Sequence, residues 1–137
     1  LIESFVFFYF QRNIKSKSNS FYDSFLDLLE ATIKYFLDEN NIVSTFNDCD
    51  IIVEGFDKAE YKAMLINSLV AHNKYIVSAS GVAGIDTEEI TVKKIADKIY
   101  IAGDFKTDFQ YAKLYSPKIF ITASIMSNII LKLVYEL

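Results

Sequence analysis

The sequence is poor in the residues that metal centres, disulfides and phosphate-binding loops require. Cys49 is the only cysteine and His72 the only histidine. An internal disulfide is therefore excluded, and soft ligands are too few for a structural zinc site. The four glycines, at positions 55, 81, 84 and 103, cannot form a G-x-G-x-x-G phosphate loop. A disulfide-stapled secreted fold, a zinc module and a complete dinucleotide-binding fingerprint are all disfavoured.

Excess charge and long hydrophobic runs are also lacking. The net charge is −4, and the lysines are scattered apart from Lys15 and Lys17, so no nucleic-acid partner is expected. The best apolar run, Ile119 to Leu131, falls short of the roughly 20 residues of a membrane span and is interrupted by Thr122 and Asn128. We therefore expect a buried helix there, no membrane partner and a cytoplasmic location.

What remains describes a globular chain. It has 137 residues, of which 52% are hydrophobic and 23% charged, enough for one domain with a sizeable core. We expect residues 1–20 to be an N-terminal strand and polar linker, and residues 21–137 to form the domain. Because the chain starts with Leu1 and the aromatic run Phe5–Phe10, we expect it to be a piece of something longer.

The first third has short and irregular patterns. Leu1–Phe10 has strand propensity, and Gln11–Ser20 is polar enough for a loop. The spacing after Phe21 predicts a short helix, the alternation over Ala31–Leu37 predicts a strand, and Asn41–Asn47 suits one or two helical turns.

The middle of the chain predicts a βαβ unit. Cys49–Glu54 is a short apolar strand, a helix runs from Asp57 to about Ala71, and Tyr75–Ala79 is a second buried strand. Such a crossover places its two strands parallel in one sheet. The apolar stripe expected on the helix consists of Ala59, Ala63, Ile66 and Val70, with Leu65 and Leu69 beside it.

The last third predicts a hairpin and a final helix. Ile90–Ile95 and Lys98–Ala102 alternate as two strands of a hairpin, and Gly103–Tyr115 has no clean period and suits a loop. Ser116 and Pro117 then give an N-cap and a first-turn proline, opening a helix to the end of the chain. That helix is apolar nearly all round, so burial on more than one side is expected. The predicted fold class is α/β.

Asp57 stands where the first buried strand gives way to a helix, and it has two interpretations. Ligands of open parallel sheets gather beyond the carboxyl ends of strands, where a carboxylate can hold magnesium against nucleotide oxygens. Asp57 with Glu60 three residues on is also a helix start of the capping-box type, and capping alone would explain it.

Other candidate residues carry similar alternatives. Lys58 and Lys62 are spaced i and i+4, so they share a helix face and either can touch a phosphate or simply face solvent. The glycines of Ser80–Gly84 can let backbone approach a ligand or form a plain loop. His72 is placed to gain from a helix dipole, and Cys49 opens a buried strand, so packing is favoured over catalysis. No nucleophile, base and orienting group can be assembled.

Several segments together resemble the ThiF-like family of sulfur-carrier adenylyltransferases, relatives of the ubiquitin-activating enzymes. They run in family order over residues 38–134, about the last two thirds of the chain. The matching segments are DENNIVSTFNDCDIIVEGFDKAEYKAMLI, YIVSASGVAGIDTEEITVKKI, KIYIAGDF and the Ser-Pro-Lys opening of the final helix.

This resemblance implies a Rossmann-like three-layer fold and an activity. Such enzymes use MgATP to adenylate the C-terminal Gly-Gly of a small ubiquitin-like sulfur carrier in thiamine-type sulfur metabolism, and they are homodimers. The family's D-N/K-x-x-x-R/K segment corresponds here to Asp57–Lys62, which implies Asp57 as the catalytic, magnesium-side carboxylate and Lys58 and Lys62 as nucleotide-binding residues. The stretch Phe105–Tyr115 lies where the family has a loop that crosses over the carrier's tail.

The chain also departs from the family pattern. The glycine-rich ATP loop, the strand before it, the acidic residue for the ribose and the N-R-Q segment are missing, and so is the paired-cysteine zinc motif of some relatives. We therefore expect the C-terminal portion of an adenylyltransferase, inactive alone and without zinc. The alternatives are a degenerate, non-catalytic module for carrier binding or dimerisation, and a piece of an unrelated Rossmann-like oxidoreductase.

Overall fold

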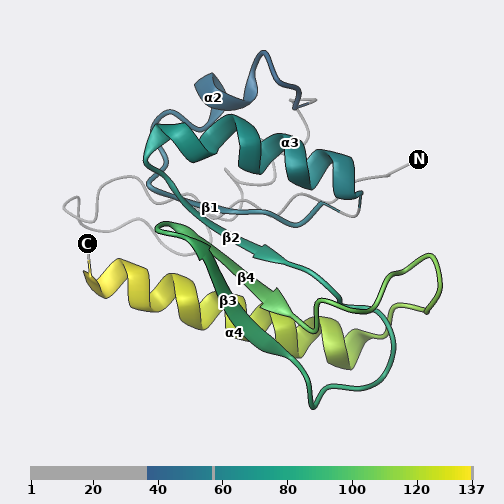
Figure 1. The fold of residues 1–137 in the computed structure, drawn as a ribbon. Helices are drawn as coiled ribbons and strands as arrows, with labels where there is room; N and C mark the ends of the chain where they lie inside the picture. Colours follow the sequence, from purple (N-terminus) through teal and green to yellow (C-terminus); the bar gives the residue numbers. More distant parts are fainter. Residues whose placement is uncertain (1–36, 57, 137) are drawn as a thin grey trace, which may run out of the picture. The chain divides into compact units, whose positions relative to one another are not determined.

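The computed structural model describes residues 37–56 and 58–136. It divides within a strand into two compact units, Leu1–Ile76 and Val77–Leu137, and each unit is described by itself (Figure 1). Several predicted features lie outside the described residues: the strand Leu1–Phe10, the linker Gln11–Ser20, the helix after Phe21, the strand over residues 31–36, and Asp57.

The first unit contains the predicted strand-helix-strand order. Helix α2 (Ile42–Thr45) precedes strand β1 (Ile51–Val53), helix α3 (Ala59–Leu69), the 3₁₀ turn η1 (Val70–His72) and the start of strand β2 (Tyr75–Ala79). The Tyr75 amide donates to the Asp50 carbonyl at 2.9 Å, which joins the entries of β1 and β2. The core of this unit consists of Ile42, Phe46, Cys49, Ile51, Ile52, Phe56, Leu65, Leu69 and Ile76.

Helix α3 starts later than the sequence predicts. Its N-cap is Lys58, whose backbone is extended at φ −93° and ψ 133°, and its first helical bond runs from the Lys62 amide to the Lys58 carbonyl at 3.2 Å. The predicted capping box needs Asp57 at the N-cap, so that prediction is wrong in register. At the other end the helix tightens into η1 and stops at Asn73, whose φ of 58° is left-handed.

The buried side of α3 also differs from the predicted stripe. Leu65 and Leu69 are buried, whereas Val70, placed on the main stripe by the sequence, is 54% exposed. Ala59 and Ala63 are exposed as well. The two leucines are one turn apart and bury more apolar area than the alanines would, so they define the packed side.

The second unit contains the rest of β2, strand β3 (Thr91–Ala96), strand β4 (Ile99–Gly103) and helix α4 (Ser116–Glu136). Strands β3 and β4 pair antiparallel, with Thr91 opposite Gly103 and a bulge between Lys94 and Ala96, so the predicted hairpin is confirmed. The sheet order is β1-β2-β4-β3. Strands β2 and β4 run in the same direction in Figure 1, so the sheet is mixed and the fold is α/β.

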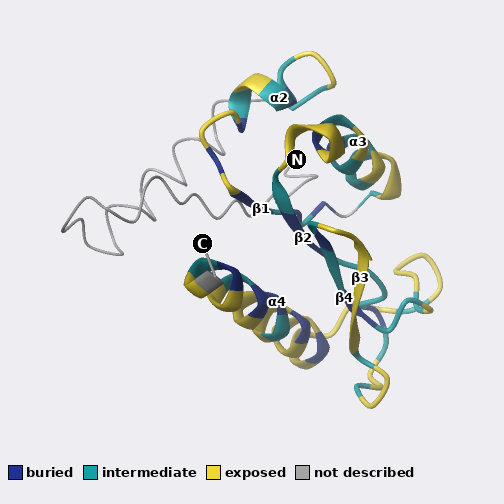
Figure 2. Cartoon of the chain, turned by 60° about the vertical axis from the view of Figure 1, so that its left-hand side comes forward, coloured by how far each residue is buried: buried dark blue, intermediate teal, exposed yellow. Residues whose placement is uncertain are grey.

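Helix α4 is buried along one side only. It packs on β4, and its buried residues follow one stripe at helical spacing: Lys118, Thr122, Met126, Ile129 and Leu133. The opposite side exposes large apolar residues, among them Phe120 at 70% and Tyr135 at 83% (Figure 2). Burial on more than one side is therefore not found among the described residues. Among these residues α4 is also the one helix whose length and composition would let it cross a membrane.

Candidate functional site

In the described part of the chain, two strand ends carry a carboxylate that pairs with a lysine of the next helix. In the first unit Glu54 follows β1 and pairs with Lys62 of α3. In the second unit Asp104 follows β4 and pairs with Lys118 of α4. Neither pair was predicted from the sequence, although each carboxylate directly follows a short apolar strand.

The Glu54 carboxylate is completely buried, and both of its oxygens have donors. Oε1 accepts the Phe56 amide at 2.5 Å, and Oε2 lies 2.5 Å from Lys62 Nζ. The Lys62 side chain keeps 22% of its surface exposed, so one side of the Glu54–Lys62 pair, which we call the first corner, faces solvent. The backbone bond holds the turn through Gly55 and Phe56 that leads into α3.

The structure places the predicted nucleotide-binding residues around this corner, but it does not describe Asp57. Lys62 contacts Glu54, whereas Lys58 lies over the Tyr61 ring with Nζ 5.8 Å from its centroid. The two lysines therefore have different neighbours. Their phosphate-binding role, like the metal-binding role of Asp57, stays a prediction.

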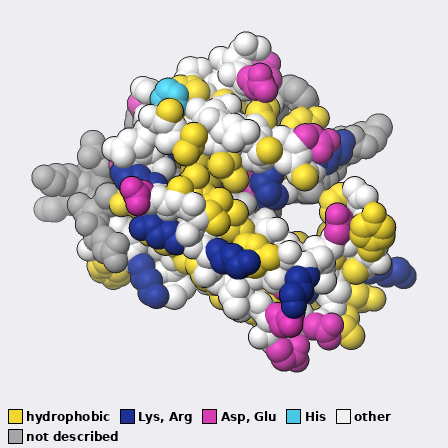
Figure 3. Space-filling view, viewed as in Figure 1, with side chains coloured by type: hydrophobic (Ala, Val, Ile, Leu, Met, Phe, Trp, Pro, Cys, Tyr) yellow, Lys and Arg dark blue, Asp and Glu magenta, His cyan; other side chains and the backbone are white. Residues whose placement is uncertain are grey.

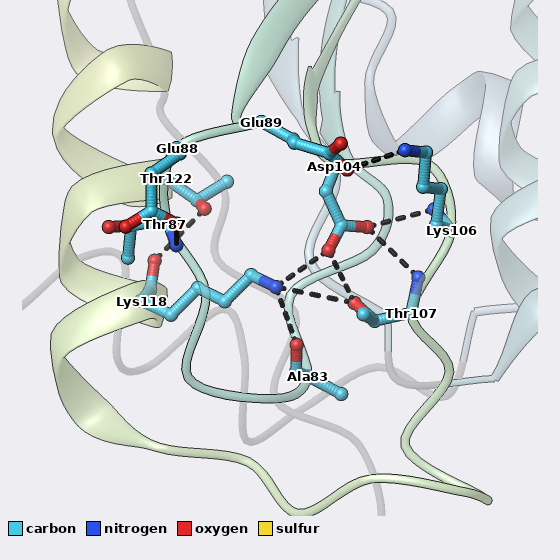
Figure 4. Close-up of polar contacts among 9 residues, drawn as sticks. All are labelled: Ala83, Thr87, Glu88, Glu89, Asp104, Lys106, Thr107, Lys118 and Thr122. Carbon is cyan, nitrogen blue, oxygen red and sulfur yellow. Dashed lines mark hydrogen bonds and ion pairs between the residues drawn. The ribbon is translucent and has the colours of Figure 1, made fainter.

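The Asp104–Lys118 pair is the more enclosed of the two. The Lys118 side chain has no exposed surface and Asp104 keeps 7%. Lys118 Nζ donates to Asp104 Oδ2 and to the Ala83 carbonyl, each at 2.6 Å, and lies 3.5 Å from Thr107 Oγ1 (Figure 4). An ammonium group has three donors, and here each has an acceptor.

Asp104 collects further donors from the residues that follow it. It accepts the amides of Lys106 at 2.8 Å and Thr107 at 2.9 Å, and the Thr107 hydroxyl at 2.9 Å. Burial by itself raises the pKa of Asp104, but the Lys118 ammonium and these hydrogen bonds outweigh it and hold that pKa well below its usual range. The carboxylate is therefore ionised throughout the physiological range.

The glycines near this pair are explained by close approach of backbone to backbone. Gly81 has φ +74°, and a Cβ there would overlap Asp104 Oδ1. Gly103 has φ +147°, and a Cβ there would overlap the Ser80 carbonyl oxygen. The space beside both residues is filled by the protein itself. Of the two interpretations of Ser80–Gly84, the structural loop is the one that these contacts support.

Residues 104–115, which we call the strap, connect β4 to α4. At its root the Asp104 amide donates to the Gly81 carbonyl at 3.2 Å, and at its far end the Gly84 amide donates to the Lys113 carbonyl at 2.8 Å. Both ends are therefore tied to the same loop, residues 80–84. Between them the strap exposes two aromatic residues, Phe109 at 50% and Tyr111 at 88%.

The remaining sequence candidates have ordinary surroundings. Cys49 is buried, and burial raises the pKa of its thiol to about 11, which leaves it protonated and unreactive. His72 lies exposed in η1. Figure 3 shows both positive and negative side chains on the face that it draws, with several acidic side chains gathered at its lower edge.

Comparison with known proteins gives no match. No family model, no curated protein and no solved structure matches this chain. Any assignment of function therefore depends on the sequence resemblance and on the geometry described above.

Proposed function

We propose that this chain is the C-terminal part of an ATP-dependent adenylyltransferase of the ThiF-like type. Its substrate would be the C-terminal Gly-Gly carboxylate of a small ubiquitin-like sulfur carrier. The parent protein would be cytoplasmic and homodimeric, with a Rossmann-like fold.

One observation supports this proposal above the others. The order strand, helix, strand, hairpin, strap and final helix is the order that the resemblance implies for the family, and the described residues adopt it from β1 to α4. The resembling segments 38–66, 75–95 and 98–105 contain α2, β1, β2 and β4 and most of α3 and β3.

The chemistry assigned to the first unit follows from its carboxylates. Magnesium takes oxygen ligands and usually binds through one or two carboxylates together with nucleotide phosphates. Both oxygens of Glu54 already have protein donors, and the resemblance implies Asp57 as the carboxylate for the ion. MgATP, when bound, would supply the α-phosphorus that the carrier's carboxylate attacks, and pyrophosphate would leave. Lys58 and Lys62 would balance charge on the phosphates.

The same chain lacks groups that the reaction needs. Electrostatic stabilisation of the transferring phosphoryl group is the largest catalytic contribution in such reactions. The glycine-rich loop that would supply backbone donors is missing from the sequence. We therefore expect the isolated chain to bind carrier but not to catalyse adenylation.

A second candidate is a non-catalytic module that binds the carrier or dimerises. The exposed apolar side of α4, with Phe120, Leu131 and Tyr135, favours it because exposed apolar surface often marks an interface. The codons that precede Leu1 separate the two candidates. A continuous reading frame that encodes a glycine-rich loop supports the enzyme part, and a stop codon followed by a nearby start supports the module.

The test of carrier recognition is a binding titration combined with a pyrophosphate-exchange assay. The chain is mixed with a ubiquitin-fold sulfur carrier that ends in Gly-Gly, with MgATP present. We expect binding that weakens when the two glycines are removed, and no exchange above background. Absence of binding to the intact carrier would overturn the proposal, and exchange at an ordinary enzyme rate would overturn the predicted inactivity.

A further inference from the structure

Lys118 occupies a position that is unusual for a lysine. Its side chain is fully buried at the start of α4, and its three donors reach two other segments of the second unit. Lysine is rarely buried without a function or a full set of partners, because its charge is strongly hydrated in water. Here the partners are complete, so the question is what this arrangement holds in place.

The segment it holds is the root of the strap. Asp104 and Thr107 are both strap residues, and both contact Lys118 Nζ. The Ala83 carbonyl, its third acceptor, belongs to loop 80–84, to which both strap ends are tied. An antiparallel bridge between Ala83 and Leu114 closes the far end. Lys118 therefore joins the strap, the loop beneath it and the helix that follows.

The strap root also contains strained backbone. Phe105 has φ 63°, a left-handed value that costs energy in a residue with a bulky side chain. Its ring lies beneath Lys93 of β3, whose Nζ is 4.0 Å from the ring centroid. The hydrogen bonds of Asp104 fix this conformation, because its amide donates to Gly81 before Phe105 and its carboxylate accepts the amides of Lys106 and Thr107 after it. Without them the strap root would relax, because most other residues of the strap are exposed.

We propose that Lys118 is a positioning residue for carrier recognition. Through Asp104 and Thr107 it fixes the strap root. The exposed middle of the strap, with Phe109 and Tyr111, is thereby kept in the conformation that binds the carrier's C-terminal tail. This inference rests on the proposed function and on the resemblance behind it, which implies that residues 105–115 cross over that tail. Lys118 itself touches no substrate, because its side chain has no exposed surface.

The variants that test this change the network and leave the exposed strap surface intact. Lys118→Met keeps the length of the side chain and removes its charge. Thr107→Val removes only the hydroxyl that links Lys118 to Asp104. This variant tests the same network if Lys118→Met fails to fold. Lys74→Gln is the matched control, because Lys74 Nζ also bonds an acceptor, the Asn47 carbonyl at 2.7 Å, but this hydrogen bond is exposed and lies outside the strap.

Two measurements are made on each variant of the full chain. The first is the ratio of dissociation constants for a ubiquitin-fold carrier without and with its terminal Gly-Gly. The second is amide hydrogen exchange over residues 105–115, with the β3–β4 hairpin as internal reference. We expect Lys118→Met to lower the ratio by about tenfold and to speed strap exchange by a similar factor, with the hairpin unchanged. The effect of Thr107→Val should be smaller and in the same direction, and Lys74→Gln should match the wild type.

The outcomes separate a positioning role from a structural one. An unchanged ratio in both network variants would overturn the inference, and so would an equal loss of affinity for both forms of the carrier, which a general loss of structure would cause. If the wild type itself binds no carrier, the proposed function fails and this role falls with it, whereas the exchange data would still show whether Lys118 holds the strap.

Discussion

The two strand-end pairs have the same parts but different surroundings. In each, a carboxylate follows a short strand and meets a lysine of the next helix, Glu54 with Lys62 and Asp104 with Lys118. Lys62 retains contact with solvent at 22% exposure, whereas Lys118 has none. A lysine with an exposed side can exchange its partner for a ligand at low cost, and a fully enclosed one cannot. This difference favours the proposed ligand-binding role for the Glu54–Lys62 pair and the proposed positioning role for the Asp104–Lys118 pair.

The largest effect should come from breaking the enclosed pair. Lys118→Met leaves the Asp104 carboxylate and the Ala83 carbonyl without their buried donor, so the free energy of unfolding should fall by about 3–5 kcal/mol. Urea denaturation measures it, and Lys106→Gln, which breaks the exposed pair of Lys106 with Glu89, should leave it nearly unchanged. Equal losses in the two variants would remove the difference between enclosed and exposed pairs on which the comparison depends.

Low pH should reduce the stability that the Asp104–Lys118 pair contributes. The pKa of Asp104 is held well below its usual range in the folded protein, so its stabilising contribution is complete above the pKa of the unfolded chain, about 4. That contribution is lost as the pH falls from about 4 toward the lower pKa of the folded state. Asp104→Asn should therefore flatten the dependence of unfolding free energy on pH between about 4 and 2. Parallel curves for the variant and the wild type would contradict this.

The glycine beneath the strap should tolerate substitution poorly. A Cβ at Gly81 would overlap Asp104, so Gly81→Ala should cost about 3 kcal/mol of unfolding free energy. Gly84→Ala is the matched control, because Gly84 also has a positive φ of +80° but its nearest neighbour would lie 3.8 Å away. It should cost only about 1 kcal/mol, from the backbone conformation alone. Thermal or urea unfolding of both variants distinguishes close approach from backbone conformation as the reason for glycine.

Apart from the control variants, the smallest of these effects is expected at the Glu54–Lys62 pair. Lys62→Met removes one donor from Glu54, but Phe56 still donates and solvent reaches the lysine side, so the loss should be about 1–3 kcal/mol. A loss as large as that of Lys118→Met in the same urea titration would mean that the two corners are equally closed. Lys62 would then be a poor candidate for a phosphate ligand.

The parts of the fold that the sequence predicts well are those set by local periodicity. The βαβ unit and the β3–β4 hairpin have alternating or helical spacing within single segments, so composition and spacing suffice to find them. The start of α3 was missed by two residues, because Asp57 and Glu60 match a capping motif that the backbone at Lys58 does not use. The side of α4 that packs on the sheet was not predictable either. Apolar residues occur on every side of this helix, so tertiary contacts decide which side is buried.

The candidate site was predicted only in part, for a related reason. Asp57, Lys58 and Lys62 could be proposed from the sequence because they lie in one short segment that resembles a family motif, and their role stays a prediction. The pair Asp104–Lys118 spans 14 residues and the pair Glu54–Lys62 spans 8, and each forms only when a strand end and a helix meet. Ordinary lysines on a helix surface have the same local pattern as Lys118, so its burial could be learned only from the structure.

The most direct test of the whole account is a crosslinking map of the carrier's tail. A ubiquitin-fold sulfur carrier with a photoreactive residue just before its terminal Gly-Gly is bound to the chain, irradiated, digested and analysed by mass spectrometry. The account predicts that the crosslinks fall within residues 105–115 and that Lys118→Met disperses them. Crosslinks concentrated on β3 or on the exposed side of α4, or none above the level of a carrier without its tail, would contradict it.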